Sequence, residues 1–367
     1  MGGLSTSDDT EAMLRGLKTE EETIDVGPAG TTMRFLTALF STRLGDRKIL
    51  TGSERMKARP IGILVDCLRE LGAEINYLEK EGFPPLEIKG RELVGGKLSI
   101  PASVSSQFIS ALLLIAPSMS KGLELELVGK VVSWPYINMT LKILEKFGAE
   151  VHVTGNHLFV RGPLDGVDLF EVEADWSAAS YHYIIASLAK QADIVLEGLS
   201  PESLQADAAI VGLAKNCGIE SSWNNGKLRL QTTGVSNPFS FDFIECPDIA
   251  QSLAVMTATI PGNCRLTGLE TLRIKETDRI TALVNELSKY KAITQSGEDW
   301  MELDCSQANW KADEKIATYH DHRMAMSFAP LALLTKTIDI EYPIVVAKSY
   351  PAFWDDLKRL GFKLSYY

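Results

Sequence analysis

Leu68-Arg-Glu-Leu-Gly72 ends a predicted helix with a glycine, and similar helix ends return along the chain. The other copies are Leu144-Glu-Lys-Phe-Gly148, Leu213-Ala-Lys-Asn-Cys-Gly218, Leu287-Ser-Lys-Tyr-Lys291 and Leu357-Lys-Arg-Leu-Gly361, with a weaker copy at Met13-Leu-Arg-Gly-Leu-Lys18. A glycine directly after a helix adopts the left-handed conformation at little cost, so it marks the helix end. The five clear copies are about 70 to 76 residues apart, which predicts about six repeats.

Each repeat predicts the same order of elements. A hairpin follows the helix end, as in residues 220–223 and 227–230 around the turn Asn224-Asn-Gly226. A helix that is apolar nearly all round comes next, and such helices are buried inside a domain. These helices are predicted at 32–42, 107–116, 177–188, 249–260 and 324–334. A strand and an amphipathic helix complete the unit. The chain is therefore predicted to be α/β and built from βαβαββ repeats, of which the first is truncated.

The composition indicates a globular protein of two domains, because 367 residues exceed one ordinary core. The apolar runs are too short to span a bilayer, and no basic segment followed by an apolar stretch predicts a secretory signal. The formal net charge of −11 argues against nucleic acid as a partner. The five cysteines have no CxxC spacing, which predicts reduced, mostly buried thiols in a cytoplasmic protein.

Two dense charged clusters stand in apolar surroundings, Leu272-Arg-Ile-Lys-Glu-Thr-Asp-Arg279 and Tyr319-His-Asp-His-Arg-Met-Ala-Met326. Lys275, Glu276 and Arg279 are three or four residues apart, which predicts that they share one face of a helix. His322 and Arg323 directly precede an apolar run, which predicts a buried helix with a charged N-terminus. Cations gathered in this way suit a small, highly anionic ligand, and salt-bridge networks at helix ends are the alternative.

The starts of two predicted buried helices favour a phosphate ligand. Ser105-Ser-Gln107 offers three hydrogen-bonding side chains beside the free N–H groups of a helix start, although plain capping would need only one. The glycines of Gly27-Pro-Ala-Gly-Thr31 would let a ligand approach the backbone closely. This segment lacks the lysine of a P-loop and the third glycine of a dinucleotide fingerprint, so neither a P-loop nor an NAD-dependent enzyme is supported.

Seven segments together resemble the 5-enolpyruvylshikimate-3-phosphate (EPSP) synthase family and follow that family's order. They are GPAGTTMR (27–34), RMKARPIG (55–62), SSQ (105–107), VVSWPY (131–136), IKETDR (274–279), HDHRMAM (320–326) and AKSYP (347–351). The resemblance implies the inside-out α/β barrel of the enolpyruvyl transferases, with two domains of three βαβαββ units that close on ligand at a hinge. We place the boundary between residues 172 and 173. The N-terminal domain, 1–172, is expected to bind shikimate-3-phosphate, and the C-terminal domain, 173–367, to carry most phosphoenolpyruvate-binding cations.

The resemblance also implies the site. Shikimate-3-phosphate is expected to be bound by Ser105, Ser106, Ser133, Tyr136, Asp248 and Lys275. Phosphoenolpyruvate is expected to be bound by Gly30, Thr31, Arg59, Gln107, Arg279, Arg323 and Lys348. Planar guanidinium groups suit this substrate, because they bind carboxylate and phosphate with two bonds each.

The implied reaction is the transfer of an enolpyruvyl group by addition and elimination. The catalytic residues are predicted to be Asp248, Glu276, Lys275 and His322. Asp248 is the predicted base for the 5-hydroxyl of shikimate-3-phosphate, Glu276 exchanges the proton at C3 of phosphoenolpyruvate, and His322 relays or orients. No metal or organic cofactor is implied, because arranged cations supply the activation. We expect a cytoplasmic monomer of chorismate and aromatic amino-acid biosynthesis, sensitive to glyphosate because Gly30 leaves space beside the phosphoenolpyruvate site.

Some features depart from the family. We find no counterpart of its PGSKS-like motif, which predicts the loss of an N-terminal strand and impaired activity. Pro28 and Thr271 stand where asparagine is common in the family. The first alternative is therefore a non-catalytic remnant of this fold that binds anions or a partner chain. The second is the sister enolpyruvyl transferase that acts on UDP-N-acetylglucosamine, although the KETDR, DHRMAM and SSQ motifs favour the shikimate enzyme.

Overall fold

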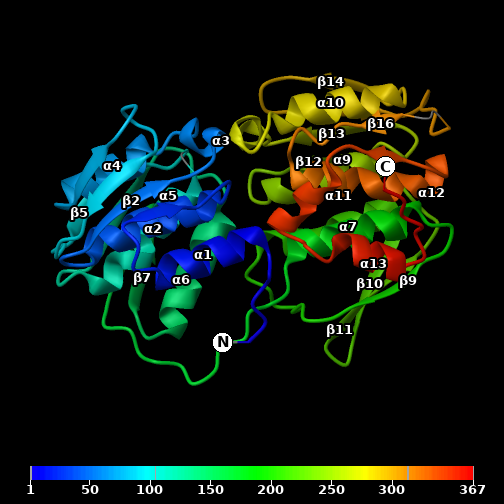
Figure 1. Ribbon diagram of the computed structural model, residues 1–367. Helices are drawn as coiled ribbons and strands as arrows, with labels where there is room; N and C mark the ends of the chain where they lie inside the picture. Colours follow the sequence, from blue (N-terminus) through cyan, green and yellow to red (C-terminus); the bar gives the residue numbers. More distant parts are fainter. Residues whose placement is uncertain (1, 104, 312–313, 367) are drawn as a thin grey trace. The chain divides into compact units, whose positions relative to one another are not determined.

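The computed structural model describes residues 2–103, 105–311 and 314–366 (Figure 1). The chain forms two compact units, unit 1 with residues 1–171 and unit 2 with residues 172–367. Each unit has its own apolar core. The division lies one residue before the boundary that we placed from the sequence.

Unit 1 contains two four-stranded sheets with the same topology. One has the order β1-β2-β4-β3, with β1 Thr23–Asp25, β2 Arg47–Thr51, β3 Glu74–Tyr77 and β4 Leu86–Lys89. The other has the order β5-β6-β8-β7, with β5 Gly96–Pro101, β6 Leu123–Val128, β7 Glu150–Thr154 and β8 His157–Arg161. In each sheet the first two strands are parallel and the remaining pairs are antiparallel.

The helices of unit 1 lie between these strands in the predicted βαβαββ order. The chain starts with α1 (Asp8–Lys18). The repeat that forms the first sheet then contains the helices α2 (Gly30–Thr42), α3 (Glu54–Lys57) and α4 (Gly62–Glu70). The second contains α5 (Ser106–Ile115), the 3-10 turn η1 (Ala116–Ser118) and α6 (Trp134–Lys146). The repeat predicted from the helix ends is confirmed in this unit.

Unit 2 repeats the same topology once in full. Its sheet β12-β13-β15-β14 consists of β12 Ser240–Asp242, β13 Asn263–Thr267, β14 Ile293–Ser296 and β15 Met301–Asp304. The helical segments of this repeat are η4 (Pro247–Ile249), α9 (Ala250–Thr257), η5 (Glu270–Ile274) and α10 (Arg279–Lys289).

Two smaller sheets complete unit 2. The sheet β10-β11-β9 contains β9 Asp193–Leu196, β10 Ile219–Asn224 and β11 Lys227–Thr232, and β16 (Lys315–Ile316) pairs in parallel with β17 (Asp339–Ile340). Their helical segments are α7 (Trp176–Leu188), η2 (Ala206–Ala209), α8 (Ile210–Leu213), η3 (Ala214–Cys217), α11 (His322–Phe328), η6 (Ala329–Leu331), α12 (Ala332–Thr335), η7 (Pro343–Lys348) and α13 (Phe353–Arg359). The predicted hairpin around Asn225 and Gly226 is confirmed as β10 and β11, and both turn residues have positive φ.

The five clear helix ends share one backbone conformation. Gly72, Gly148, Gly218 and Gly361 have φ values of 102°, 89°, 76° and 95°. Lys291 occupies the same place with a φ of 57°, so the repeat imposes a left-handed residue even where the glycine is missing. The weaker copy differs, because α1 ends at Lys18 and Thr19 is extended, with a φ of −73°.

The predicted apolar helices form the two cores, with some corrections to their bounds. In unit 1, α2 packs on α5, and in unit 2, α7, α9 and α11 pack on one another. The helix predicted at 249–260 starts as the 3-10 turn η4 and is α-helical only from Ala250 to Thr257. The helix predicted at 324–334 starts at His322 and is interrupted by η6, because Pro330 has no N–H group to continue it.

Two composition-based expectations can be compared with the structure. All five cysteines are free, and four of them are buried, which confirms the prediction of reduced, mostly buried thiols. No helix within the described residues has the length and apolar character needed to cross a membrane.

Candidate active site

In unit 1, the starts of α2 and α5 are joined by a hydrogen bond. Gln107 Nε2 donates to Thr31 Oγ1 at 2.8 Å. Ser105 caps α5, since its Oγ accepts from the backbone N–H of Gln107 at 3.3 Å, and Ser106 is the first residue of that helix. The residue before α2 is Ala29, whose side chain cannot cap the helix. Backbone N–H groups at such a helix start are available to an anion.

Two guanidinium groups lie against the backbone of Gly30. A Cβ atom placed on Gly30 would be 2.6 Å from Nη1 of both Arg34 and Arg59. Arg34 is buried and donates from Nη1 to the carbonyl of Gly30 at 2.8 Å. We did not predict Arg34, although its position four residues after Gly30 places it one helical turn away. The absence of a side chain at residue 30 is therefore what gives these cations access to the start of α2.

The remaining predicted residues of unit 1 lie at the start of α6, which packs beside α5. Ser133 precedes α6 with a left-handed φ of 55°, and Tyr136 follows in the first turn. Ser110 and Thr140 join the two helices through their hydroxyl oxygens, 2.8 Å apart. Unit 1 thus brings Gly30, Thr31, Arg59 and Gln107 together, with Ser105 and Ser106 at the start of α5 and Ser133 and Tyr136 at the start of α6.

In unit 2, the guanidinium of Arg279 is surrounded by three carboxylates. Its Nε donates to Asp321 Oδ2 at 2.7 Å, its Nη2 donates to Glu276 Oε2 at 2.8 Å, and its Nη1 donates to Asp248 Oδ1 at 3.3 Å. Arg279 and Asp321 are both buried. Every nitrogen of this guanidinium is therefore engaged by a carboxylate within the unit.

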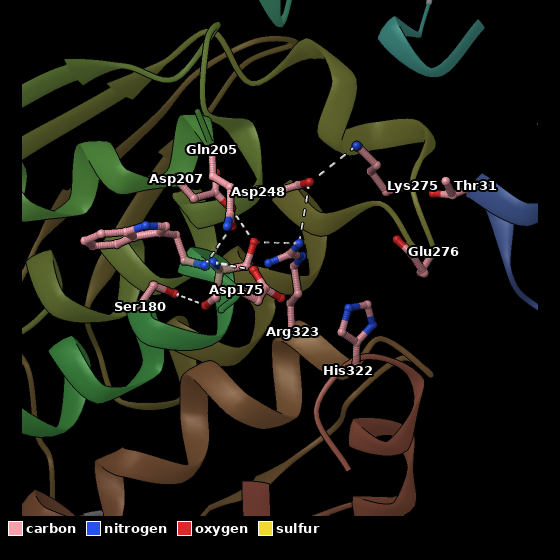
Figure 2. A network of polar contacts seen from close by, with 12 residues as sticks. Thr31, Asp175, Ser180, Gln205, Asp207, Asp248, Lys275, Glu276, His322 and Arg323 are labelled. Carbon is pink, nitrogen blue, oxygen red and sulfur yellow. Dashed lines mark hydrogen bonds and ion pairs between the residues drawn. The ribbon is translucent and has the colours of Figure 1, made fainter. Parts of the chain in front are cut away.

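Asp248 lies among three cations, of which Figure 2 shows Lys275 and Arg323. It is 3.5 Å from Lys275 Nζ, 3.3 Å from Arg279 Nη1 and 3.5 Å from Arg323 Nη2. Burial alone would raise the pKa of the Asp248 carboxyl, but the charges of Lys275, Arg323 and Arg279 outweigh it and hold the pKa well below its usual range. Asp248 is therefore an ionised hydrogen-bond acceptor in this structure.

The prediction that Lys275, Glu276 and Arg279 share a helix face is wrong. Lys275 directly follows η5, and α10 begins only at Arg279. Asp278 ends the non-helical stretch, because its carboxylate accepts from the N–H of Thr281 at 3.1 Å and caps α10. Glu276 nevertheless reaches Arg279 and lies 3.6 Å from Lys348 Nζ, so the loop brings the predicted residues together without helical spacing.

Arg323 has mostly neutral partners. Its Nη2 donates to Ser177 Oγ at 3.2 Å, and its Nη1 donates to Tyr181 Oη at 3.5 Å. Asp248 lies 3.5 Å from it, and the carboxylates of Asp207 and Asp175 also attract its charge. The predicted buried helix with a charged start is confirmed, since α11 begins at His322 and Asp321 caps it by accepting from the N–H of Arg323 at 2.8 Å.

His322 is buried and electrically neutral. Burial lowers the pKa of its imidazole to about 3, which the nearby Asp321 opposes and the charges of Lys348 and Arg323 assist. Its Nδ1 lies 3.7 Å from Asp321 Oδ1 and has no hydrogen-bond partner among the described residues. A neutral imidazole can orient a ligand through hydrogen bonds, but at neutral pH it lacks the second ring proton that an imidazolium would donate as an acid.

Sequence reasoning missed a second layer of polar residues behind Arg323. Asp207 accepts a hydrogen bond from the Ser177 hydroxyl, and Asp175 caps α7. Gln205 joins the start of α7, since its Oε1 accepts from the N–H of Trp176 at 2.9 Å. Asp175 and Ser177 stand at a predicted helix start and could have been found there. Asp207 and Gln205 belong to no recognisable motif, so only the folded chain identifies them.

One face of α10 holds the segment that leads to His322 and Arg323. Glu286 is buried and accepts from the Tyr319 hydroxyl at 2.7 Å and from the N–H of Ala317 at 3.1 Å. Lys289 donates to the carbonyl of Lys315 at 2.7 Å. Further along this segment, Tyr319 and His320 both have positive φ, a costly conformation for residues with side chains. The helix that presents Arg279 therefore also fixes a strained approach to α11.

Among the described residues, no three His, Cys, Asp or Glu side chains form a group that could hold a metal ion.

Comparison with known proteins identifies the family. The family model of EPSP synthase (3-phosphoshikimate 1-carboxyvinyltransferase) matches residues 6–357. A 3-phosphoshikimate 1-carboxyvinyltransferase of Bacteroides fragilis is 46% identical over 362 residues, which are 98% of this chain and 88% of the relative. One of Sulfurovum sp. is 38% identical over 92% of this chain and 78% of the relative. The predicted loss of an N-terminal strand is not borne out by these comparisons.

A solved structure agrees with the sequence relatives. The EPSP synthase of Acinetobacter baumannii matches with a TM-score of 0.72 at 25% identity, covering 93% of this chain and 79% of that one. The fold is therefore the two-domain α/β fold of the enolpyruvyl transferases. On the family match and these relatives, the chain belongs to the EPSP synthase family.

Proposed function

We propose that this chain is a transferase that moves the enolpyruvyl group of phosphoenolpyruvate to the 5-hydroxyl of shikimate-3-phosphate and releases inorganic phosphate. Family membership supports the reaction. The observation within the structure that best supports it is Asp248, an ionised carboxylate within 3.5 Å of Lys275, Arg279 and Arg323. A site for two anionic substrates needs such cations, and a hydroxyl nucleophile needs such a carboxylate.

Unit 1 is suited to hold phosphate and carboxylate groups. Ser105, Ser106 and Ser133 would bind the phosphate of shikimate-3-phosphate through hydroxyls and backbone N–H groups, and Tyr136 would pack against its ring. Arg59, Gln107, Thr31 and the backbone of Gly30 would bind phosphoenolpyruvate. Gly30 supports this assignment because any side chain there would collide with the guanidinium groups of Arg34 and Arg59.

Unit 2 is suited to the chemistry. Arg323 would bind phosphoenolpyruvate, because its hydroxyl partners compete for its charge less strongly than carboxylates do. Lys348 and Lys275 would bind further anionic oxygens. Arg279 would act mainly by fixing Asp248, Glu276 and Asp321, since all its nitrogens are already engaged.

The addition step would form the bond between the 5-oxygen and C2. Asp248 would accept the hydroxyl proton while the protonated Glu276 carboxyl donates a proton to C3 of phosphoenolpyruvate. The low pKa of Asp248 makes it a weak base as long as no substrate anion is bound to the surrounding cations. Substrate phosphate and carboxylate groups would neutralise those cations and raise its basicity where it is needed.

The elimination step would remove a proton from C3 and break the bond between C2 and the phosphate oxygen, which leaves the enolpyruvyl ether and inorganic phosphate. The Glu276 carboxylate left by the addition step, held in place by Arg279 and Lys348, would take the proton back from C3. His322 would orient a reacting group as a neutral imidazole. No metal or organic cofactor enters this scheme.

The product would feed chorismate and aromatic amino-acid biosynthesis, in a monomeric and cytoplasmic enzyme. Glyphosate would compete with phosphoenolpyruvate beside Gly30. Turnover that is unchanged in millimolar glyphosate would contradict that part of the proposal.

The test is phosphate release by the full chain with phosphoenolpyruvate and either shikimate-3-phosphate or UDP-N-acetylglucosamine. We expect release with shikimate-3-phosphate and its loss in Arg323→Gln. Arg279 is a poor control because its removal leaves buried carboxylates unpaired. Release with UDP-N-acetylglucosamine alone would support the sister transferase. Calorimetric binding of shikimate-3-phosphate without release would support the non-catalytic alternative.

A further inference from the structure

We propose that Asp207 is a positioning residue, which holds the Ser177 hydroxyl and, through it, the guanidinium of Arg323 beside Asp248 (Figure 2). The inference rests on the proposed function, because it concerns a cation assigned there to phosphoenolpyruvate. Asp207 lies in η2.

The hydrogen bonds run in one direction. The Ser177 hydroxyl has a single proton, which it donates to Asp207 Oδ2. Its oxygen lone pairs are then directed to Arg323 Nη2, which donates at 3.2 Å. A hydroxyl that donates to a carboxylate is a stronger acceptor, since hydrogen bonds in series polarise one another. Asp207 and Ser177 are both buried, so these bonds are shielded from water.

The two segments that carry this pair are fixed to each other. Gln205 stands two residues before Asp207, and its Nε2 donates to the carbonyl of Ala174 at 2.8 Å while its Oε1 accepts from the N–H of Trp176 at 2.9 Å. Asp175 Oδ1 accepts from the N–H of Ser177 at 2.7 Å. The distance between Asp207 and the Ser177 hydroxyl is thus set by η2 and the start of α7 together.

This arrangement affects how Arg323 meets an anion. Its bond to Ser177 is shorter than the 3.5 Å contacts to Tyr181 and Asp248. Without the hydrogen bond from Arg323 to the Ser177 hydroxyl, the attraction of Asp248 would draw the guanidinium into a closer ion pair. Such a pair would occupy the cation and lower the basicity of Asp248, so both binding and proton acceptance would suffer.

The charges around Asp207 make the effect depend on pH. The groups that face it are Asp248 from η4, Arg323 from α11, Asp175 at the start of α7, and the Cys246 thiol before η4. Burial raises the pKa of the Asp207 carboxyl to about 7, and the charge of Asp248 adds to the rise. Asp207 is therefore ionised above about pH 7 and neutral below it.

The sign of the stability change separates positioning from a structural role. A carboxyl whose pKa is raised on folding destabilises the protein as pH rises, because the ionised form is costly to bury. Asp207→Asn removes that cost and keeps an oxygen acceptor for Ser177. We therefore expect the variant to melt at the same or a higher temperature at pH 8 while its function declines.

The experiment compares Asp207→Asn, Ser177→Ala, the double variant and the control Ser180→Ala. Ser180 is a buried serine one turn further along α7. Its hydroxyl bonds to Ser252 and to the backbone carbonyl of Ser177, so Ser180→Ala removes a buried serine hydroxyl and leaves the bonds of the Ser177 hydroxyl in place. At pH 8 we expect kcat/KM for phosphoenolpyruvate to fall roughly tenfold in Asp207→Asn, the effect of weakening one charge-assisted hydrogen bond. The double variant should lose no more than Ser177→Ala alone, and Ser180→Ala should match the wild type.

The pH profile gives a second readout. The ratio of wild-type to Asp207→Asn kcat/KM should shrink toward one as the pH falls below 7, because wild-type Asp207 is then neutral too. A folded Asp207→Asn variant with wild-type kcat and KM at pH 8 would overturn the inference. So would additive losses in the double variant.

A crystal structure of Asp207→Asn keeps this test independent of the proposed reaction. We expect the Arg323 guanidinium to move from Ser177 toward Asp248, and an unchanged guanidinium would overturn the inference. If the wild-type chain released no phosphate, the proposed function would fail, while the displacement of Arg323 would still decide the role of Asp207.

Discussion

The helix starts of the two units have corresponding places in the repeat but differ in chemistry. In unit 1 the buried helices α2 and α5 begin with Gly30, Thr31, Ser106 and Gln107, joined by a neutral hydrogen bond from Gln107 to Thr31. In unit 2 the starts of α7, η4 and α11 carry Asp175, Asp248 and Asp321. At the helix starts themselves, one repeated backbone thus presents a set of neutral side chains in unit 1, where the cations Arg34 and Arg59 lie beside Gly30, and carboxylates in unit 2. We expect unit 1 to bind, and unit 2 to respond to charge and pH.

Unit 2 contains the same contrast on a smaller scale. Arg279 is bonded to three carboxylates, whereas the closest partner of Arg323 is a serine hydroxyl. Arg279 and Arg323, which come from adjacent motifs, therefore have different roles. The first organises the carboxylates, and the second remains available to a ligand.

The largest expected effect comes from removing Arg279. Arg279→Gln should lower the free energy of unfolding by about 3–5 kcal/mol, the cost of leaving a buried ionic partner unpaired. Urea denaturation measures it. Arg323→Gln is the matched control and should lose substantially less stability while losing activity. Equal losses of stability would contradict the division of duties between the two arginines.

Tyr319→Phe tests whether unit 2 depends on the strained approach to α11. The change removes the 2.7 Å bond to Glu286 and should cost about 1.5–3 kcal/mol, as for a hydrogen bond to a charged group. It should also lower kcat, because the segment leads directly to His322 and Arg323. Tyr183→Phe, which removes a bond to Ser221 elsewhere in unit 2, should leave kcat unchanged. A normal kcat in a destabilised Tyr319→Phe would limit the segment to a structural role.

Gln107→Ala tests the neutral set of unit 1. It removes the 2.8 Å bond to Thr31, and a neutral hydrogen bond contributes about 0.5–1.5 kcal/mol. The affinity for phosphoenolpyruvate should therefore fall by up to about tenfold. The pH profile should keep its shape, since no titrating group is lost. Calorimetry at pH 6 and pH 8 checks this, and a loss confined to one pH would contradict the neutral character of the set.

The smallest effect concerns the repeat itself. Lys291 has the left-handed φ that the other four helix ends assign to glycine. Lys291→Gly should raise stability by up to about 1 kcal/mol, because glycine has no Cβ to clash in this conformation. Thermal unfolding measures the change, and Lys289→Gly, inside α10, should destabilise instead. A loss of stability in Lys291→Gly would show that the side chain, rather than the backbone, is selected there.

Local rules explain what the sequence could predict of the fold. Helix ends at Gly72 and Gly148, and the turn at Asn225 and Gly226, depend on the conformations of single residues, so they can be recognised without tertiary information. The same rules explain an error. Lys275 and Glu276 have helical spacing to Arg279, but Asp278 starts the helix after them, and a cap overrides spacing.

The partners within the site lie beyond such rules. Arg279 contacts Asp321, 42 residues later, and Arg323 contacts Ser177, 146 residues earlier. These pairs depend on which helix starts converge after folding. Asp207 has no motif around it, and its importance comes entirely from burial beside Ser177. Arg34 is different, because its spacing from Gly30 could have indicated it.

The most direct test of the account is the comparison of kcat with shikimate-3-phosphate affinity in Asp248→Asn. If unit 2 carries the chemistry, kcat for phosphate release should fall about 10²–10⁴-fold, the usual contribution of a general base, while the calorimetric affinity changes only a few-fold. Asp248→Asn keeps the shape of the side chain and removes its basicity. A kcat close to that of the wild type would contradict the assignment of Asp248 as the base, and a loss of affinity as large as the loss of kcat would show that its role is binding.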